Sequence, residues 1–222
     1  MNTFQPDLIV EVTGACNKAC VGCYAPNVVA KDSATIFEKR PELFISSMAL
    51  NNAWNEIESS PSITAIRGGE PTLHPKLPVF LIMASNKSNQ VFLETHGRWL
   101  LPENVKNYRE LINIIREKKV VVKLSFDKMH GMKKEELQQT TDFLSWYEID
   151  YRIAITEANL PDYIESRSLC SFISEDKIIF QQKAMIADQL VRPTIGTINV
   201  RGEIKRTLTH KFELETTLGV AL

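Results

Sequence analysis

Three cysteines within eight residues constrain this chain more than any other feature of its sequence. Cys16, Cys20 and Cys23 follow directly after the short apolar run 8–12. A shared metal or metal cluster explains such crowding better than a disulfide framework, particularly in a reducing compartment. Soft sulfur ligands favour iron–sulfur or zinc centres. The loop that carries these thiols is therefore the first candidate for a functional site.

Short β-branched runs alternate along the chain with longer stretches of helical period. Several of the runs are nearly continuous in apolar residues, as is typical of parallel strands covered on both faces. The expected strands are 8–12, 63–66, 91–94, 120–125, 151–155 and 177–180. The expected helices are 42–58, 105–118, 134–147 and 161–171.

A strand followed by a helix, repeated in this way, predicts an α/β fold with a parallel sheet and right-handed crossovers. Six such units are too few for a closed eight-stranded barrel, so we expect a partial (β/α)6 TIM-like barrel. After residue 193 the pattern changes, and 197–200 and 204–208 flank Arg201-Gly202-Glu203 as a β-hairpin would. We expect residues 1–192 to form the barrel, with the hairpin and tail, residues 193–222, appended to it.

The charge balance argues against nucleic acid or an anionic membrane as the main partner. The 222 residues carry a formal net charge of −1, which gives no electrostatic case for either. No apolar run approaches the roughly 20 residues of a membrane helix. Residues 1–6 contain no basic stretch leading into an apolar run, which argues against a signal peptide. The expected location is the cytoplasm.

Three thiols on one loop leave two interpretations open. A structural zinc site usually closes with four protein ligands, but Cys170 is far along the chain, and His74 or His96 would have to fold back. A cluster held by three thiolates instead leaves one iron open to an exogenous ligand, which makes it a catalytic centre. The alternative, a non-catalytic iron–sulfur or zinc-binding module, predicts a fourth protein ligand.

The segment Gly68-Gly69-Glu70-Pro71 follows the second expected strand. Two glycines at a strand end allow a close backbone approach to a ligand, and Glu70 offers a charged acceptor for a ligand ammonium group. Alone, such a segment is an ordinary strand-to-loop turn. At the strand end next to the cysteine loop, it indicates a binding site.

Together, these two motifs resemble the signature of the radical S-adenosylmethionine superfamily. The resemblance implies that Cys16, Cys20 and Cys23 bind one [4Fe–4S] cluster, whose fourth iron is chelated by S-adenosyl-L-methionine. It also implies an electron donor of the flavodoxin or ferredoxin type. Reductive cleavage of the cofactor in this family yields a 5′-deoxyadenosyl radical, which abstracts hydrogen from a substrate.

Further strand ends carry weaker similarities. The segment 94–97 resembles a Thr-Asn-Gly element of the family, with His96 in place of Asn, and 125–127 is similar to a Ser-x-Asp element. Many members also carry an aromatic residue just before the third cysteine, where this chain has Gly22, so Tyr24 becomes the candidate for adenine packing. Turn or helix-cap roles are the alternative for each polar residue. The residues implied to contact the cofactor are Gly68, Gly69, Glu70, Thr95, Ser125, Asp127, Tyr24 and Thr156.

The C-terminal hairpin is the best indication of subclass. Residues 196–207 resemble the hairpin that opens the cysteine-rich extension of many peptide-modifying members, yet no cysteine follows Cys170 to hold an auxiliary cluster. The chain resembles a peptide (RiPP) maturase, or a lyase such as a splicease, reduced to its catalytic core. Such members act on ribosomally made peptides by epimerisation, crosslinking or backbone excision. A glycyl-radical activase or a small-molecule radical enzyme is the alternative.

Two expectations concern how a peptide would reach the site. Because Leu8 already begins the first expected strand, we expect a separate peptide-recognition protein. An exposed strand edge, 197–200 or 204–208, can pair with an extended peptide by β-augmentation; the alternative is a hairpin that only caps the barrel. Cys170, within a helical stretch, is expected to be a buried structural cysteine, with a hydrogen-atom donor as the alternative.

Overall fold

One curved sheet organises the computed structural model, which describes residues 5–20, 23, 28–29, 33–157, 160–182 and 196–205. Its eight strands lie in the order β10-β9-β1-β4-β5-β6-β7-β8. All neighbours from β9 to β8 are parallel, and only β10 runs antiparallel, against β9. The strands are β1 (Leu8–Thr13), β4 (Ile63–Gly68), β5 (Gln90–Thr95), β6 (Val121–Ser125), β7 (Tyr151–Glu157), β8 (Ile178–Gln182), β9 (Gly196–Ile198) and β10 (Ile204–Lys205).

Helices follow most of the parallel strands. The α-helices are α1 (Ser33–Lys39), α2 (Ser47–Asn55), α3 (Leu77–Ser85), α4 (Arg109–Glu117), α5 (Lys134–Trp146) and α6 (Leu160–Leu169). The 3-10 turns are η1 (Pro41–Leu43), η2 (Pro71–Leu73), η3 (Arg98–Leu100), η4 (Val105–Tyr108) and η5 (Glu175–Lys177). A separate small sheet pairs β2 (Ala15–Cys16) with β3 (Val28–Val29). Within the described ranges, no helix combines the length and apolar character needed to cross a membrane.

The sequence prediction of a parallel α/β fold with a partial barrel is confirmed, and all six expected strands are present. The expected helix 42–58 is divided: a 3-10 turn at 41–43 is followed by extended chain. Ser46 then caps α2, its side chain accepting a hydrogen bond from the Ala49 amide at 3.0 Å. Helix α3 was not predicted, because its sequence LPVFLIMAS is apolar on every side and shows no helical period.

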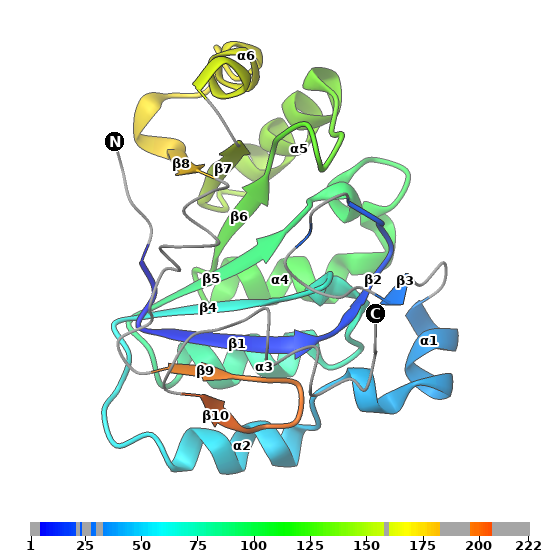
Figure 1. The fold of residues 1–222 in the computed structure, drawn as a ribbon, viewed down its shortest axis with the longest axis vertical. Coiled ribbons are helices and arrows are strands. Elements are labelled where there is room, and N and C mark those ends of the chain that lie inside the picture. Colours follow the sequence, from blue (N-terminus) through cyan, green and yellow to red (C-terminus); the bar gives the residue numbers. More distant parts are fainter. Residues whose placement is uncertain are drawn as a thin grey trace.

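Alternate residues along each strand point to opposite faces of the sheet. On one face, Leu8 of β1 and Leu93 of β5 join a core with Trp54 of α2, Phe80 of α3 and Ile115 of α4. Figure 1 shows α3 and α4 behind the strands, where they cover this face. The intervening strand residues point to the other, concave side, and several of them are also buried: Ile9, Ala65, Phe92 and Val121.

The predicted C-terminal hairpin is confirmed, but its position corrects one expectation. β9 pairs with β1 in parallel, Thr197 lying opposite Ile9, as well as with β10. Residues 196–198 are therefore inside the sheet, and 197–200 does not offer a free edge for β-augmentation. Gly202 has the positive φ of 78° that the turn requires, and the turn packs on α2, since a Cβ there would lie 2.9 Å from the Ala49 carbonyl oxygen. The boundary at residue 193 stays a prediction.

Candidate active site

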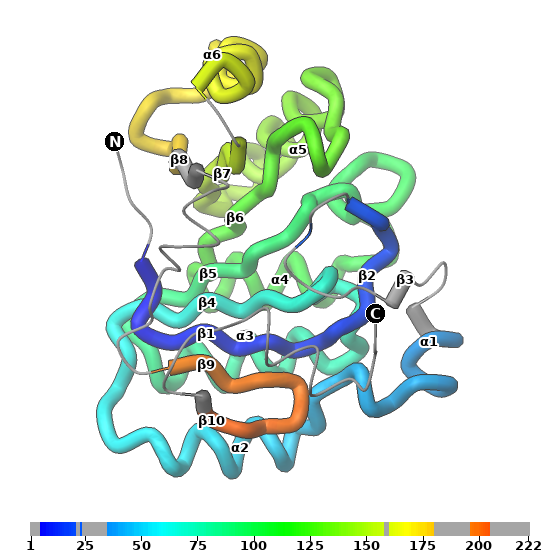
Figure 2. The backbone as a smooth tube through the Cα atoms, viewed as in Figure 1, coloured from blue at the N-terminus to red at the C-terminus, as the bar shows by residue number. Residues whose placement is uncertain are grey.

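The carboxyl ends of β1, β4, β5 and β6 meet at one edge of the sheet, as parallel strands must. Figure 2 shows the dark-blue chain leaving β1, passing through β2 and turning back beside the green loop that follows β5. The side chain of Lys18 then donates a hydrogen bond to the carbonyl oxygen of His130, in the segment after β6. The structure therefore brings the cysteine loop over the ends of the next strands, as the sequence predicted.

Gly68 and Gly69 dock the start of the cysteine loop onto the end of β4. The Gly69 amide donates to the Thr13 carbonyl at 2.7 Å, and the Glu70 amide donates to the Ala15 carbonyl at 2.8 Å. A Cβ at Gly68 would lie 2.3 Å from the Thr13 carbonyl oxygen, and one at Gly69 would lie 2.2 Å from that of Ala15. The close approach expected for these glycines is thus made to the chain's own backbone, so a larger side chain would collide there before it met any ligand.

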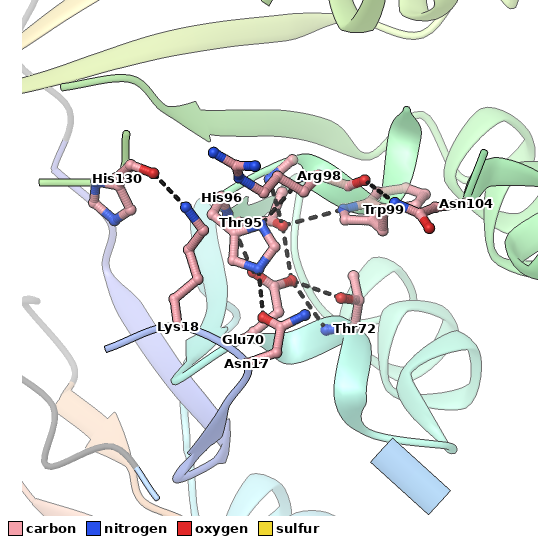
Figure 3. A network of polar contacts seen from close by, with 11 residues as sticks. Asn17, Lys18, Glu70, Thr72, Thr95, His96, Arg98, Trp99, Asn104 and His130 are labelled. Atoms are coloured by element: carbon pink, nitrogen blue, oxygen red, sulfur yellow. Dashed lines mark hydrogen bonds and ion pairs between the residues drawn. The ribbon is translucent and has the colours of Figure 1, made fainter. Parts of the chain in front are cut away.

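Glu70 lies at the centre of the polar network drawn in Figure 3, and only 1% of the residue is exposed. Its Oε1 accepts from the Thr72 hydroxyl at 2.7 Å, the Thr95 hydroxyl at 2.7 Å and the Thr72 amide at 3.3 Å. Its Oε2 accepts from the His96 amide at 3.1 Å. Because a carboxylate has about four acceptor sites, its three donors make Oε1 the more crowded oxygen, whereas Oε2 has the His96 amide and the His96 ring beside it.

Thr95 connects this carboxylate to the turn after β5. Its hydroxyl donates to Glu70 and accepts from the Gly97 amide and from the Trp99 indole N–H, both at 3.1 Å. These three bonds use the one donor and two acceptor positions of a hydroxyl. Thr95 therefore positions Glu70 and the following turn, rather than offering a free hydroxyl to a ligand.

His96 extends the network to the cysteine loop. Its Nε2 lies 2.7 Å from Oδ1 of Asn17 and 3.2 Å from Oε2 of Glu70. Its Nδ1 accepts a hydrogen bond from the Arg98 amide at 3.1 Å. Burial lowers the pKa of His96, although the charge of Glu70 acts in the opposite direction. The link between residues 17 and 96 was not predicted, because the sequence gives no sign of which side chain the loop would meet.

The three loop cysteines share one electrostatic environment and form no disulfide. Burial raises the pKa of Cys16 to about 12, while a hydrogen bond from the Lys18 amide lowers it. Burial also raises the pKa of Cys20, against the positive charges of Lys18 and Arg98. The negative charge of a Cys23 thiolate raises the pKa of both Cys16 and Cys20 further. A bound cation can replace the protons that burial retains.

The donor set suits an iron–sulfur cluster, since it consists of three soft thiols with an amide donor and two cationic side chains close by. No three His, Cys, Asp or Glu side chains of the described residues already converge on one metal position. The fit therefore rests on the chemistry of the donors and their placement on one loop.

The residues considered as a fourth zinc ligand are engaged elsewhere. Cys170 is fully buried in the main apolar core, as expected for a structural cysteine. Both ring nitrogens of His74 are used: Nε2 lies 2.9 Å from the Ile45 carbonyl oxygen, and Nδ1 accepts from the Lys76 amide at 3.0 Å. The ring of His96 is engaged in the same way.

The remaining candidates occupy the ends of β6 and β7. The buried carboxylate of Asp127 accepts from the His130 amide at 2.9 Å and lies 2.8 Å from that ring's Nδ1, so it holds the residue that Lys18 contacts. Ser125 ends β6, half-buried, and Thr156 lies buried in β7. Tyr24, the candidate for adenine packing, lies outside the described residues.

A row of buried and partly buried charges lies just below these strand ends and was not predicted. Arg67 and Glu11 are register partners with 3.4 Å between the guanidinium and the carboxylate, and Lys123 and Glu94 are partners with 3.0 Å between theirs. Burial lowers the pKa of Lys123. Burial also tends to raise the pKa of Glu94, but the positive charges of Lys123 and Arg67 outweigh this effect, and the pKa of Glu94 lies below its ordinary value. The sequence does contain a sign of this row, because each of these largely apolar runs includes a charged residue, which is uncommon in buried parallel strands.

Comparison with known proteins gives a fold but no close relative. No protein-family model matches the chain, and no curated protein matches it. Native anSMEcpe with bound AdoMet and Cp18Cys peptide is similar over 79% of this chain and 50% of its own, with 16% identity and a TM-score of 0.52. Native anSMEcpe with bound AdoMet alone gives 16% identity over the same shares of both chains, with a TM-score of 0.53.

Streptococcus suis SuiB bound to precursor peptide SuiA covers 96% of this chain and 45% of its own at 13% identity, with a TM-score of 0.48. The chain spans about half the length of the matched anSMEcpe structures. At these identities the two anSMEcpe matches establish a shared fold, which agrees with the partial barrel that the alternation of strands and helices predicts.

Proposed function

We propose that this chain is a radical S-adenosylmethionine enzyme whose substrate is a peptide. The observation that carries the proposal is the placement of a three-thiol loop over the strand ends, docked by Gly69 and Glu70. A shared fold with structures that contain AdoMet and, in one case, a peptide supports it. The reaction type, whether backbone excision, epimerisation or crosslinking, follows only from the sequence resemblance.

Cys16, Cys20 and Cys23 would hold one [4Fe–4S] cluster. With S-adenosylmethionine bound, that cluster supplies reductive cleavage of the cofactor to a radical that removes hydrogen from the substrate. The Lys18 amide donates to the sulfur of Cys16, which stabilises the thiolate form that a metal needs. The backbone bonds from Gly69 and Glu70 hold the start of the loop at the end of β4.

Glu70 would bind the ammonium group of the cofactor through Oε2. This oxygen accepts from the backbone amide of His96 and lies near its ring, whereas Oε1 accepts from three donors. Thr95 acts by orienting that carboxylate. Ser125 and Asp127 would lie nearer the ribose or carboxylate, and Thr156 and Tyr24 nearer the adenosine.

A peptide would approach the strand ends from the side of the sheet opposite α3 and α4 in Figure 1. A deoxyadenosyl radical reacts with many C–H bonds, so the site must hold one bond close and exclude water. The row of charges beneath the strand ends supplies polar groups at that position. A separate peptide-recognition protein and a flavodoxin- or ferredoxin-type electron donor complete the proposed system.

Anaerobic reconstitution of the full chain with iron and sulfide tests the cluster assignment. The wild-type protein should gain the visible charge-transfer absorbance of an iron–sulfur cluster, and Cys→Ala at position 16, 20 or 23 should remove most of it. Cys170→Ala is the matched control, since its thiol is fully buried in the core; it should retain the cluster. Equal loss in the control would overturn the model of an open iron.

A further inference from the structure

We propose that His96 is a positioning residue that fixes the cysteine loop and Glu70 relative to each other. This inference rests on the proposed function for its purpose, but its geometry stands independently. The segment 95–97 resembles the Thr-Asn-Gly element of the family, but His96 stands in place of the Asn. In this structure, the longer ring of His96 reaches the cysteine loop.

The tautomer of His96 follows from its hydrogen bonds. Nδ1 accepts from the Arg98 amide at 3.1 Å, so it cannot carry a proton in this arrangement. A neutral ring then has its proton on Nε2, which becomes a donor. The two acceptors around Nε2 are Asn17 Oδ1 at 2.7 Å and Glu70 Oε2 at 3.2 Å. One proton is thus shared between the loop and the carboxylate.

Backbone and ring of His96 act together on Glu70. The His96 amide donates to Oε2 at 3.1 Å, and the ring approaches the same oxygen. The side chain is only 6% exposed, so water competes weakly for these bonds. Figure 3 shows the carboxylate of Glu70 and the side-chain amide of Asn17 on the same side of the His96 ring. Because both contacts are made by the same ring, they hold Oε2 of Glu70 close to the side chain of Asn17.

Other contacts hold the loop at different points. Backbone bonds to Thr13 and Ala15 hold its start, and Lys18 reaches the segment after β6. Asn17 lies between the first and second cysteines, so its bond to His96 sets that part of the loop. Loss of the bond should leave three cysteines able to take up a cluster but misplace the cluster relative to Glu70. The expected defect is in S-adenosylmethionine binding, not in cluster content.

Two substitutions distinguish the contribution of Nδ1 from that of Nε2. In His96→Asn, the side-chain oxygen can replace Nδ1 as acceptor for the Arg98 amide, but the side chain is too short to reach Asn17. In His96→Gln, the longer side chain can place an N–H donor near the position of Nε2. We expect about tenfold weaker S-adenosylmethionine binding for His96→Asn, since one buried hydrogen bond is lost, and near wild-type binding for His96→Gln. The affinity is measured on reconstituted protein by the change that S-adenosylmethionine causes in the EPR spectrum of the reduced cluster.

A second measurement needs neither cluster nor cofactor. Hydrogen exchange of the backbone amides at 14–20 in the metal-free chain should be about tenfold faster in His96→Asn and unchanged in His96→Gln. Asn17→Ala removes the same bond from an exposed position, so it should reproduce the effect without risk to the fold. The double variant should be no worse than either single one, because both remove one bond. His74→Asn, at a ring with the same local bonding, should leave this exchange unchanged.

The outcomes distinguish the two proposals. If the wild-type chain bound no cluster or no S-adenosylmethionine, the proposed function would fail, while the exchange measurement would still decide on the bridge. If exchange and affinity were the same in wild type, His96→Asn and Asn17→Ala, the positioning role of His96 would be refuted. Additive effects in the double variant would also refute it, since they would mean that the two residues act separately.

Discussion

His74 and His96 are bonded in the same local pattern but lie in different surroundings. In each, Nδ1 accepts from the amide two residues ahead, and Nε2 is directed at an oxygen far away in sequence. His74 reaches the backbone carbonyl of Ile45 and packs beside Phe44 and Phe80, with ring centroids 5.4 and 4.6 Å away. His96 reaches the side chains of Asn17 and Glu70.

Because the two rings have the same local bonding in different surroundings, we expect them to have different roles. Burial lowers the pKa of both rings, that of His74 to about 4. His74 fixes a backbone carbonyl among aromatic rings, so its removal should cost stability. His96 fixes two polar side chains at the candidate site, so its removal should cost binding. The predictions below separate stability from binding, beginning with the largest expected effect.

Gly69→Ala should disrupt the region around His96 most strongly, because it removes the docking of the whole loop. The added Cβ would lie 2.2 Å from the Ala15 carbonyl oxygen, which is backbone and must shift. We expect a loss of about 3 kcal/mol in the free energy of unfolding, together with loss of cluster uptake. Urea unfolding of the metal-free chain and iron analysis after reconstitution measure the two effects.

Gly131→Ala is the control for this prediction. Its Cβ would meet nothing within 4 Å, although its φ of 56° is left-handed. It should cost only about 1 kcal/mol, from backbone strain, and leave the cluster in place. Equal stability of the two variants would contradict the backbone contact assigned to Gly69.

Acid should destabilise the fold through His74. Its folded pKa of about 4 lies below the ordinary histidine value of 6.5, so the unfolded state binds the proton more readily. The contribution is fully present above pH 6.5 and is lost as pH falls towards 4, on the order of 3 kcal/mol in total. Urea unfolding across this range should show a steeper fall for the wild type than for His74→Gln. Identical slopes would mean that His74 is not held neutral by the fold.

His74→Asn should lower stability more than His96→Asn. The shorter side chain loses the bond to the Ile45 carbonyl and leaves a gap beside Phe44 and Phe80, which together cost about 2 kcal/mol. Its cluster content per folded molecule should match the wild type. The comparison of the two histidines would break down if His74→Asn weakened S-adenosylmethionine binding as much as His96→Asn.

Glu70→Gln tests the carboxylate that His96 is proposed to hold. The variant keeps an oxygen acceptor but loses the charge, so binding of a cofactor ammonium should weaken about tenfold. The cluster itself should be retained. Affinity is read from the EPR change on adding S-adenosylmethionine, with Thr72→Val as a control that removes one hydroxyl donor to Glu70 and keeps its charge. An affinity equal to the wild type would remove Glu70 from the cofactor site.

The fold and the loop that carries the candidate site were predictable because both depend on local patterns. Apolar runs marked six of the seven described parallel strands, and the cysteine spacing marked the loop after the first of them. Helix α3 was missed because uniform apolarity hides its period. For the two glycines, the close neighbours on the Cβ side are the backbones of Thr13 and Ala15, which are distant in sequence, and their contact with a ligand stays a prediction.

The partners of the polar side chains could not be predicted. Asn17 and His96 are 79 residues apart, and their contact depends on where the loop lies over β5. The ion pairs of Arg67 with Glu11 and of Lys123 with Glu94 likewise depend on the register between strands. Such contacts arise from tertiary structure, on which residue type and spacing along the chain carry little information.

Formation of 5′-deoxyadenosine is the most direct test of the central proposal. The reconstituted chain is incubated anaerobically with S-adenosylmethionine and dithionite, and the products are separated by liquid chromatography and mass spectrometry. We expect 5′-deoxyadenosine and methionine from the wild type and from Cys170→Ala, and none above background from Cys16→Ala, Cys20→Ala or Cys23→Ala. A wild-type protein with a full cluster that formed no 5′-deoxyadenosine, or loop variants that formed as much as the wild type, would contradict the assignment.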